Sequence, residues 1–237
     1  MTNWLERTEL LIGPEAINSL QEKHVLVVGL GGVGSFAAEF LARAGVGKLT
    51  IVDGDVIDPT NINRQLPALH STVAQSKAQL MEARIRDINP AIQLEVLEEF
   101  LDPERTWEVV QEEMDYVLDC IDSVSPKINL ITACVRKNVK VISSMGAGGK
   151  TDPSQVKVTD ISQTYHCNLA RTIRKRLRKD KINKGVKAIF CAQALKRDSL
   201  KLTDGNNFKK SFYGTISYMP ALFGLHAAAT VIEELSA

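Results

Sequence analysis

The chain has 237 residues, of which 44% are hydrophobic and 24% charged, with a formal net charge of +1. This length allows one large α/β domain, and the near-neutral charge argues against a general nucleic-acid binder. None of the four cysteines, Cys120, Cys134, Cys167 and Cys191, forms a C-x-x-C pair, which argues against structural zinc and a disulfide framework. We therefore expect a cytoplasmic protein without zinc, since the N-terminal segment also lacks the features of a secretory signal.

Strands and helices alternate through the first 150 residues. The predicted strands are short β-branched runs at His24–Gly29, Lys48–Asp53, Ile92–Val96, Asp115–Asp119 and Val139–Ser143. The predicted helices are Val33–Ala44, Ala74–Ile88, a helix from the capping residue Asp102 to Glu113, and Pro126–Lys137. This alternation predicts an α/β fold with a Rossmann-like, doubly wound and mostly parallel sheet.

The pattern changes after Gly149. We predict an antiparallel strand at Gln155–Ile161, a basic helix at Asn168–Lys179, short strands or loop at Lys187–Cys191 and Lys196–Leu202, and a turn at Asp204-Gly205. The apolar stretch Thr215–Ile232 is marginal for a membrane span and predicts a buried C-terminal helix, on the sheet or at a dimer interface. We expect a single domain over residues 1–237, with a nucleotide-binding core over 1–150 and a variable part over 151–237.

A glycine-rich motif joins the first predicted strand to the first predicted helix. The segment Gly29-Leu30-Gly31-Gly32-Val33-Gly34 fits G-x-G-x-x-G in the strand–helix context that this motif requires. Such glycines let backbone N–H groups approach a phosphate at the positive end of a helix. Asp53, at the end of the second strand, is placed to accept hydrogen bonds from ribose hydroxyls. The segment predicts a nucleotide site, and the motif by itself favours NAD.

The residues after Asp53 favour ATP. Reaction at an α-phosphate requires cations that neutralise the triphosphate and the departing pyrophosphate, and Arg64 and Lys77 can supply them, with Asn61 in a positioning role. Asp122 follows the fourth predicted strand, at the sheet edge where such folds bind ligands, and a carboxylate there can hold Mg²⁺. The alternatives are solvated surface charges for Arg64 and Lys77 and a helix cap for Asp122.

These segments resemble the superfamily of adenylyltransferases related to ubiquitin-activating enzymes. The shared marks are RTELL from Arg7, the loop GLGGVG, VDGD at Val52–Asp55, NINRQ at Asn61–Gln65, Lys77, INP at Ile88–Pro90 and LDCID at Leu118–Asp122. The resemblance implies that Asp53 binds ribose, that Arg64 and Lys77 contact phosphates, and that Asp122 supports the metal. It places Asp55 and Gln65 in the same nucleotide site. It also implies a homodimer in which Arg7 reaches the partner's ATP.

Within this superfamily, the missing C-x-x-C pairs argue against the sulfur-carrier branch. The stretches RQLPALHSTV at Arg64–Val73, IDSVSPK at Ile121–Lys127 and GAGGKTDPSQVKVTDISQT at Gly146–Thr164 are similar to the tRNA threonylcarbamoyladenosine dehydratases. This resemblance implies ATP-dependent cyclisation of a modified adenosine beside the tRNA anticodon, through adenylation of its carboxylate, and a sulfur-relay protein is a further candidate partner. The alternatives are activation of a ubiquitin-like sulfur carrier, NAD-dependent redox chemistry and a non-catalytic nucleotide-regulated adaptor.

A basic stretch follows in the last third of the chain. Asp180 is the only acidic residue among the cations between Arg171 and Lys187. At helical spacing they surround more than one face, so they cannot all serve intramolecular pairs. The residues predicted to contact tRNA phosphates are Arg171, Arg174, Lys175, Arg176, Arg178 and Lys179. The alternative is a solvated helix surface.

Overall fold

The computed structural model of the chain describes residues 3–195, 197–202 and 211–237. Its strands are β1 (His24–Val28), β2 (Lys48–Val52), β3 (Gln93–Leu97), β4 (Tyr116–Asp119), β5 (Lys140–Ser144), β6 (Val156–Asp160), β7 (Lys187–Cys191), β8 (Leu200–Leu202) and β9 (Ser211–Tyr213). Its α-helices are α1 (Glu6–Ile12), α2 (Pro14–Glu22), α3 (Gly34–Arg43), α4 (Lys77–Ile88), α5 (Pro103–Val109), α6 (Val124–Arg136), α7 (Asn168–Leu177) and α8 (Tyr218–Leu235).

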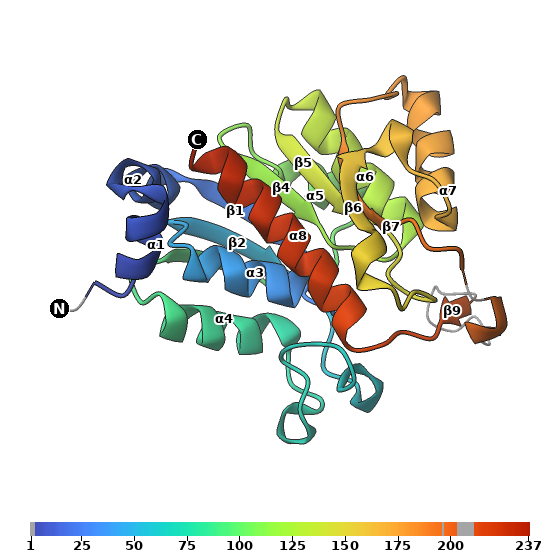
Figure 1. Cartoon of the computed structure of the whole chain (residues 1–237), viewed down its shortest axis with the longest axis horizontal. Helices are drawn as coiled ribbons and strands as arrows, with labels where there is room; N and C mark the ends of the chain where they lie inside the picture. The colour runs from blue at the N-terminus through green and yellow to red at the C-terminus, as the bar shows by residue number, and fades with distance from the viewer. Residues whose placement is uncertain (1–2, 196, 203–210) are drawn as a thin grey trace.

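A seven-stranded sheet in the order β3-β2-β1-β4-β5-β7-β6 forms the centre of the molecule (Figure 1). Every neighbouring pair is parallel except β6 and β7, which are antiparallel. The strand order reverses between β1 and β4, so a crevice is expected outside the carboxyl ends of these two strands. The predicted Rossmann-like, doubly wound sheet with an antiparallel extension is confirmed.

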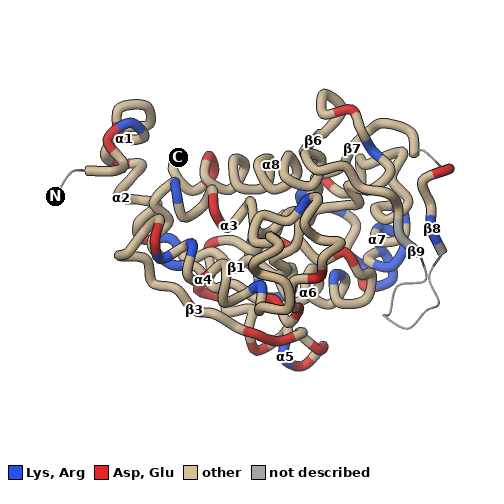
Figure 2. Tube along the Cα trace, turned by 90° about the horizontal axis from the view of Figure 1, so that it is seen from below, with Lys and Arg blue, Asp and Glu red and all other residues tan. Residues whose placement is uncertain are grey.

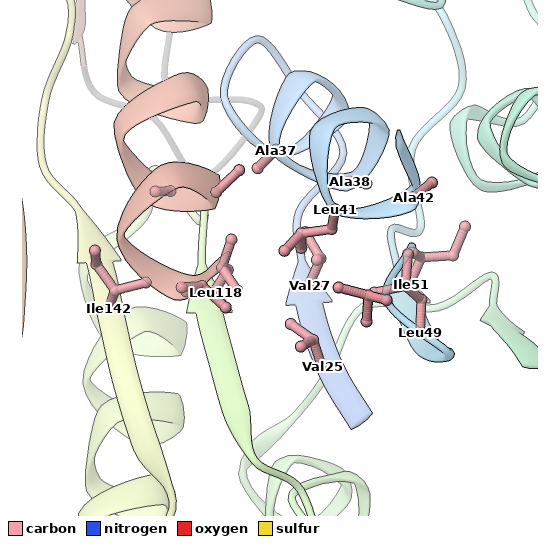
Figure 3. Packing of buried hydrophobic residues seen from close by; sticks show 14 of the residues in the cluster. Val25, Val27, Ala37, Ala38, Leu41, Ala42, Leu49, Ile51, Leu118 and Ile142 are labelled. Atoms are coloured by element: carbon pink, nitrogen blue, oxygen red, sulfur yellow. The ribbon is translucent and has the colours of Figure 1, made fainter. Parts of the chain in front are cut away.

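Two apolar cores lie on opposite faces of this sheet. Along β1, Val25 and Val27 belong to one core and Leu26 and Val28 to the other. Helices α3, α4 and α8 cover the first face (Figure 1), and Figure 3 shows α3 side chains meeting those of the strands there. Helices α5, α6 and α7 cover the second face. Burial on both faces explains why the strands read as continuous apolar runs in the sequence.

Several helix boundaries differ from their predictions. Helix α4 begins at Lys77 instead of Ala74, because the Ser76 side chain accepts a hydrogen bond from the N–H of Gln79 and caps the helix there. Helix α5 ends at Val109, before the predicted Glu113, because the chain becomes extended at the next residue. Helices α1 and α2 were not predicted. Helix α1 buries none of its own residues, so it has no inward-facing apolar stripe to detect.

The last third of the chain adds to the same sheet and core. The predicted strands at Gln155–Ile161 and Lys187–Cys191 are β6 and β7, and the apolar helix is α8, whose Phe223 and Val231 are buried in the first core. No helix of the described ranges is long and apolar enough to cross a membrane. Lys196, in the predicted strand that becomes β8, and the predicted turn Asp204-Gly205 lie outside the described residues. The single-domain description, with its division at residue 150, stays a prediction.

Candidate active site

The glycine loop joins β1 to α3 at the carboxyl end of the sheet. Gly29 has a φ of 90°, in the left-handed region. A Cβ atom built on Gly34 would lie 1.8 Å from the carbonyl oxygen of Gly29, so no larger residue fits this turn. The N–H of Leu30 donates a hydrogen bond of 2.6 Å to Oδ2 of Asp53, which anchors the loop to the end of β2. The loop therefore has a fixed shape before any phosphate binds.

Asp53 lies under this loop and is 9% exposed. Its second oxygen, Oδ1, accepts a hydrogen bond of 2.8 Å from the N–H of Asp55. Burial raises the pKa of Asp53, while the charge of Lys77 and the two backbone N–H groups act in the opposite direction. Each carboxylate oxygen can accept a further hydrogen bond, so binding of ribose hydroxyls is compatible with these contacts. The scaffolding contact with Leu30 could not be read from the sequence.

Lys77 is buried next to Asp53 and Asp55. It is 5% exposed, and its Nζ lies 2.9 Å from Oδ2 of Asp55, whose side chain is 56% exposed. The alternative of a solvated surface charge is therefore wrong for Lys77. Its ammonium group is held between a buried carboxylate and an exposed one. The charge of Lys77 thus acts on Asp53, the residue whose carboxylate holds the glycine loop.

Arg64 and Asn61 are positioned by the 3-10 turn Pro59–Asn61. Asn61 is 8% exposed, and its Oδ1 accepts a hydrogen bond of 3.2 Å from the N–H of Asp58. Nη1 of Arg64 donates to the carbonyl of Thr60 and to Oδ1 of Asn63, both at 2.7 Å. Burial lowers the pKa of Arg64, and the nearby carboxylates of Asp122 and Asp58 oppose that shift. Arg64 and Asp122 are thus within electrostatic reach of each other, although 58 residues separate them in the chain.

Gln65 contacts the glycine loop directly. A Cβ atom built on Gly31 would lie 3.6 Å from Nε2 of Gln65. Oε1 of Gln65 is buried and has no hydrogen-bond partner among the described residues. Buried polar atoms in proteins are almost always hydrogen-bonded, so an acceptor left unpaired at this place fits a donor from a bound ligand. This observation supports the predicted nucleotide-site role of Gln65.

Asp122 follows β4 at the carboxyl end of the sheet and is exposed. The N-cap residue of α6 is Ser123, so the alternative that Asp122 caps this helix is wrong. No three His, Cys, Asp or Glu side chains are grouped for metal binding within the described ranges. Mg²⁺ requires only one or two carboxylates when phosphates supply its other ligands, so an exposed carboxylate coupled to Arg64 fits the predicted metal.

A buried ion pair beneath Asp122 was missed by the sequence analysis. Nζ of Lys127 lies 2.7 Å from Oδ2 of Asp119, and both side chains are 0% exposed. Lys127 also donates to Oγ of Ser143 at 3.2 Å and to the carbonyl of Ser144 at 2.9 Å. Oδ1 of Asp119 accepts a hydrogen bond of 3.2 Å from the N–H of Ile121. The pair therefore links the ends of β4 and β5 and orients the peptide that leads into Asp122.

Arg7 lies away from the glycine loop of its own chain. It is exposed on α1. The neighbouring Leu5 packs on Gly45, because a Cβ atom built on Gly45 would lie 2.8 Å from Cδ1 of Leu5. Gly45 follows the C-terminal end of α3, whose ten residues span about 15 Å from the glycine loop at its N-terminal end. Of the residues predicted for the ATP site, Arg7 therefore lies far from the glycine loop of its own chain.

The cations predicted to bind tRNA lie on α7 and the turn that follows it (Figure 2). The apolar face of α7, formed by Ala170, Ile173 and Leu177, is buried. Arg171, Lys175, Arg176, Arg178 and Lys179 are exposed, whereas Arg174 is partly buried and donates to the carbonyl of Thr164 at 2.8 Å. None of these six cations forms an ion pair with a described residue. Nη1 of Arg176 donates to Oγ of Ser125 at 3.3 Å, so the basic helix contacts the first turn of α6, close to Asp122.

Comparisons with known proteins agree with this geometry. The model of the ThiF family matches residues 5–237. The chain is 40% identical to the tRNA threonylcarbamoyladenosine dehydratase of Bacillus subtilis (strain 168), covering 99% of this chain and 95% of that protein. It is 41% identical to the Escherichia coli (strain K12) protein of the same name, covering 81% of this chain and 75% of that protein. The chain is also 37% identical to the sulfur carrier protein ThiS adenylyltransferase of E. coli, but this match covers only 55% of this chain.

Solved structures give the same result. The structure of E. coli tRNA N6-threonylcarbamoyladenosine dehydratase, TcdA, in complex with ATP is similar with a TM-score of 0.85 and 36% identity, covering 98% of this chain and 93% of that chain. The complex of the same protein with AMP is similar with a TM-score of 0.88, covering 99% and 96% of the two chains. The resemblance to the adenylyltransferase superfamily and its dehydratase branch is confirmed.

Proposed function

The chain belongs to the ThiF family, and we propose that it catalyses the ATP-dependent cyclisation, by net dehydration, of threonylcarbamoyladenosine beside the tRNA anticodon. One observation carries the proposal. The charges of Arg64 and Asp122 act on each other although they come from separate segments, and the charge of Lys77 acts on Asp53, whose carboxylate holds the glycine loop. The chain is also similar over nearly its full length to dehydratases, and a structure of one of them contains ATP and another AMP. A reaction on tRNA agrees with the cytoplasmic location that the unpaired cysteines predict.

In this proposal the protein binds and polarises ATP. The glycine loop and the start of α3 hold the phosphates through backbone N–H groups, and Asp53 holds the ribose. Arg64 and Lys77 stabilise the charge that develops on the α-phosphate and the departing pyrophosphate. Asp122 would hold Mg²⁺, which when bound neutralises phosphate charge.

The carboxylate of the threonylcarbamoyl group attacks the α-phosphate, and pyrophosphate leaves. The acyl-adenylate then contains a good leaving group, whereas the free carboxylate did not. A neighbouring group of the same side chain attacks the activated carbonyl, AMP leaves, and the base carries a closed ring. Well-oriented intramolecular attack has effective molarities of about 10⁵ M or more, so no protein nucleophile is required. The balance is the loss of one water from the base and the conversion of ATP to AMP and pyrophosphate.

Nucleoside mass spectrometry tests this proposal. The purified protein, incubated with ATP, Mg²⁺ and tRNA that carries open threonylcarbamoyladenosine, should convert that nucleoside to a product lighter by one water and release one AMP per conversion. Deletion of the gene should make the open nucleoside accumulate. Persistence of the cyclic nucleoside in the deletion strain would assign the cyclisation to another protein.

The basic helix is proposed to bind tRNA phosphates, and Lys175→Glu tests this role. Lys175 is exposed and forms no ion pair with a described residue, so its charge is available to a phosphate. We expect the variant to bind tRNA more weakly and to lower the slope of log affinity against log salt by about 0.7–0.9 for each phosphate that it no longer neutralises. Filter binding over a salt series measures both.

Lys140→Glu is the matched control, because Lys140 is 59% exposed and lies at the amino end of β5, away from α7. An unchanged slope in Lys175→Glu would leave the basic helix as a solvated surface.

The surface of α1 supports the proposed homodimer. Leu10 and Leu11 are 82% and 83% exposed on this seven-residue helix, which buries none of its residues. Helices this short draw their stability from tertiary contacts, so two exposed leucines on α1 fit a surface that a partner covers. Apart from α1, an apolar groove of about 420 Å³ lies between α3 and α8 and includes Phe36, Phe40 and Leu225. A partner protein for sulfur relay stays a prediction.

A mixed dimer tests whether Arg7 acts on the partner's ATP. Arg7→Ala and Asp122→Asn should each abolish AMP formation in the homodimer. A heterodimer of the two variants, purified through two different tags, should regain about half of the wild-type rate, because one of its two sites then combines an intact Arg7 with an intact Asp122. If Arg7 acted within its own chain, neither site of the heterodimer would be complete. An inactive heterodimer would therefore contradict the exchange of Arg7.

A further inference from the structure

A pocket of about 330 Å³ lies beside the nucleotide crevice, and the mechanism above does not use it. Its lining residues are Gly149, Lys150, Thr151, Ser199, Gly214, Thr215 and Ile216. The volume is within the range of small-ligand sites in proteins. The exposed lining is mainly apolar and includes the side chain of Ile216, which is 40% exposed, while Thr151, Ser199 and Thr215 add hydroxyl groups. Such a surface suits a flat ligand that has both hydrogen-bonding edges and an apolar face.

The pocket walls are held together by backbone hydrogen bonds. The N–H of Gly149 donates to the carbonyl of Gly214, and the N–H of Gly214 donates to the carbonyl of Ser199, both at 2.8 Å. A Cβ atom built on Gly148 would lie 3.0 Å from Cβ of Tyr213, so this glycine allows the segment after β5 to approach β9 closely. The sequence alone left the GAGG segment without a role beyond a tight turn. In the fold, its last residue, Gly149, forms one wall of this pocket together with Lys150 and Thr151.

Lys150 fixes that wall from behind. It is 2% exposed, and its Nζ donates to the carbonyls of His166, at 3.2 Å, Cys191, at 3.3 Å, and Gln193. Burial lowers the pKa of Lys150. One ammonium group thereby ties the pocket wall to the loop before α7 and to the end of β7.

The pocket adjoins the crevice on the side of Arg64. Nδ2 of Asn63 donates to the carbonyl of Thr215 at 2.9 Å, and Oδ1 of Asn63 accepts from Arg64 at 2.7 Å. The segment that contains Thr215 continues to Pro220. A Cβ atom built on Gly32 of the glycine loop would lie 2.9 Å from Cβ of Pro220. A ligand in the pocket would therefore lie next to the cation expected at the reacting phosphates.

The pocket also adjoins the start of the basic helix. Lys150 binds the carbonyl of His166, and α7 begins at Asn168. A Cβ atom built on Gly146 would lie 4.0 Å from Cβ of Leu169. One pocket wall is thus tied to the loop that leads into the expected phosphate-binding helix, and another, through Asn63, to Arg64 of the expected ATP site. A nucleotide of an RNA loop whose backbone follows α7 would meet the pocket before it met ATP.

We propose that this pocket receives the modified adenine of the tRNA, with its carboxylate-bearing substituent directed past Asn63 toward Arg64 and the α-phosphate. The assignment rests on the proposed function, and it adds where the substrate base is held. Bases in single-stranded RNA loops can be turned outward and read on their edges, which such a pocket allows. Ile216 provides the apolar contact with the base, and Thr215 joins the pocket to Arg64 through Asn63.

The variant Ile216→Trp tests this assignment by filling the pocket. Because Ile216 is 40% exposed, the larger side chain can be accommodated without unfolding, which thermal melting verifies. We expect the Kd of free N6-threonylcarbamoyladenosine, measured by calorimetry in the presence of a non-hydrolysable ATP analogue, to rise by about tenfold or more. The KM for modified tRNA should rise similarly, and the Kd of the ATP analogue alone should stay within about twofold. Ile216→Ala, which only shortens an apolar side chain, should show a smaller effect in the same direction.

Leu200→Trp is the matched control, because Leu200 is an apolar residue of similar exposure, 43%, at the start of β8, and it does not line the pocket. Leu200→Trp should leave the Kd of the free nucleoside and the Kd of the ATP analogue unchanged. Unchanged nucleoside affinity in Ile216→Trp would overturn the assignment, and an equal loss of ATP affinity would give the pocket to ATP instead. If the wild-type protein does not convert modified tRNA, the proposed function itself fails. Normal conversion by wild type together with an unchanged KM in Ile216→Trp would reject the pocket alone.

Discussion

Arg64→Ala is expected to reduce tRNA-dependent AMP formation by about 10²–10³-fold, the usual effect of removing one electrostatic contact to a transition state. Arg64 is held in place before ATP binds by the carbonyl of Thr60 and Oδ1 of Asn63. Burial lowers its pKa, but a guanidinium group stays protonated in proteins, so the charge is present at every working pH. The rate of AMP release at saturating modified tRNA measures this loss of activity.

Arg86→Ala is the control for this variant. Arg86 is an exposed arginine on α4 whose partner is Glu82, at 2.9 Å. Exposed ion pairs contribute about 0–1 kcal/mol, so we expect normal AMP formation and an almost unchanged melting temperature. If Arg64→Ala retains the wild-type rate, Arg64 does not belong to the reacting site and the proposed use of the crevice is wrong.

Lys127→Met is expected to lower the free energy of unfolding by about 3–5 kcal/mol, because it leaves the buried carboxylate of Asp119 without its cation. For a chain of this size, that loss corresponds to a fall in Tm of about 6–20 °C. Thermal or denaturant unfolding measures it. Lys140→Met, at a lysine that is 59% exposed, should cost little and is the control.

The penalty of Lys127→Met should also depend on pH. Burial already raises the pKa of Asp119, and the loss of Lys127 removes the largest opposing cause and raises the pKa further. A folded-state pKa above the unfolded value means that the folded protein holds an extra proton at intermediate pH. Stability is then lost as the pH rises through the folded-state pKa, so the penalty should be smaller at about pH 5 than at about pH 8. An equal penalty at both pH values, or one below about 1 kcal/mol, would contradict the buried ion pair.

The predicted arrangement of the first 150 residues was largely correct, for a simple physical reason. Strands buried on both faces must be apolar throughout, and the helices that cover them must repeat their apolar residues every three or four positions. Both patterns are local, so they survive in the sequence. Helix ends were less predictable, because they depend on individual capping contacts such as that of Ser76.

The sequence by itself determined the strands, the helices that cover them and the glycine loop, because each depends on residues that are neighbours in the chain. Only the tertiary structure decided where each charge lies. Lys77 and Lys127 are both lysines near a helix start, yet the first pairs with the exposed carboxylate of Asp55 and the second with the fully buried carboxylate of Asp119. The tertiary structure likewise placed Arg7 at the opposite end of α3 and joined Gly149 to Gly214 as a pocket wall. Burial and long-range contact are properties of the packed chain, since they arise only where segments distant in sequence meet.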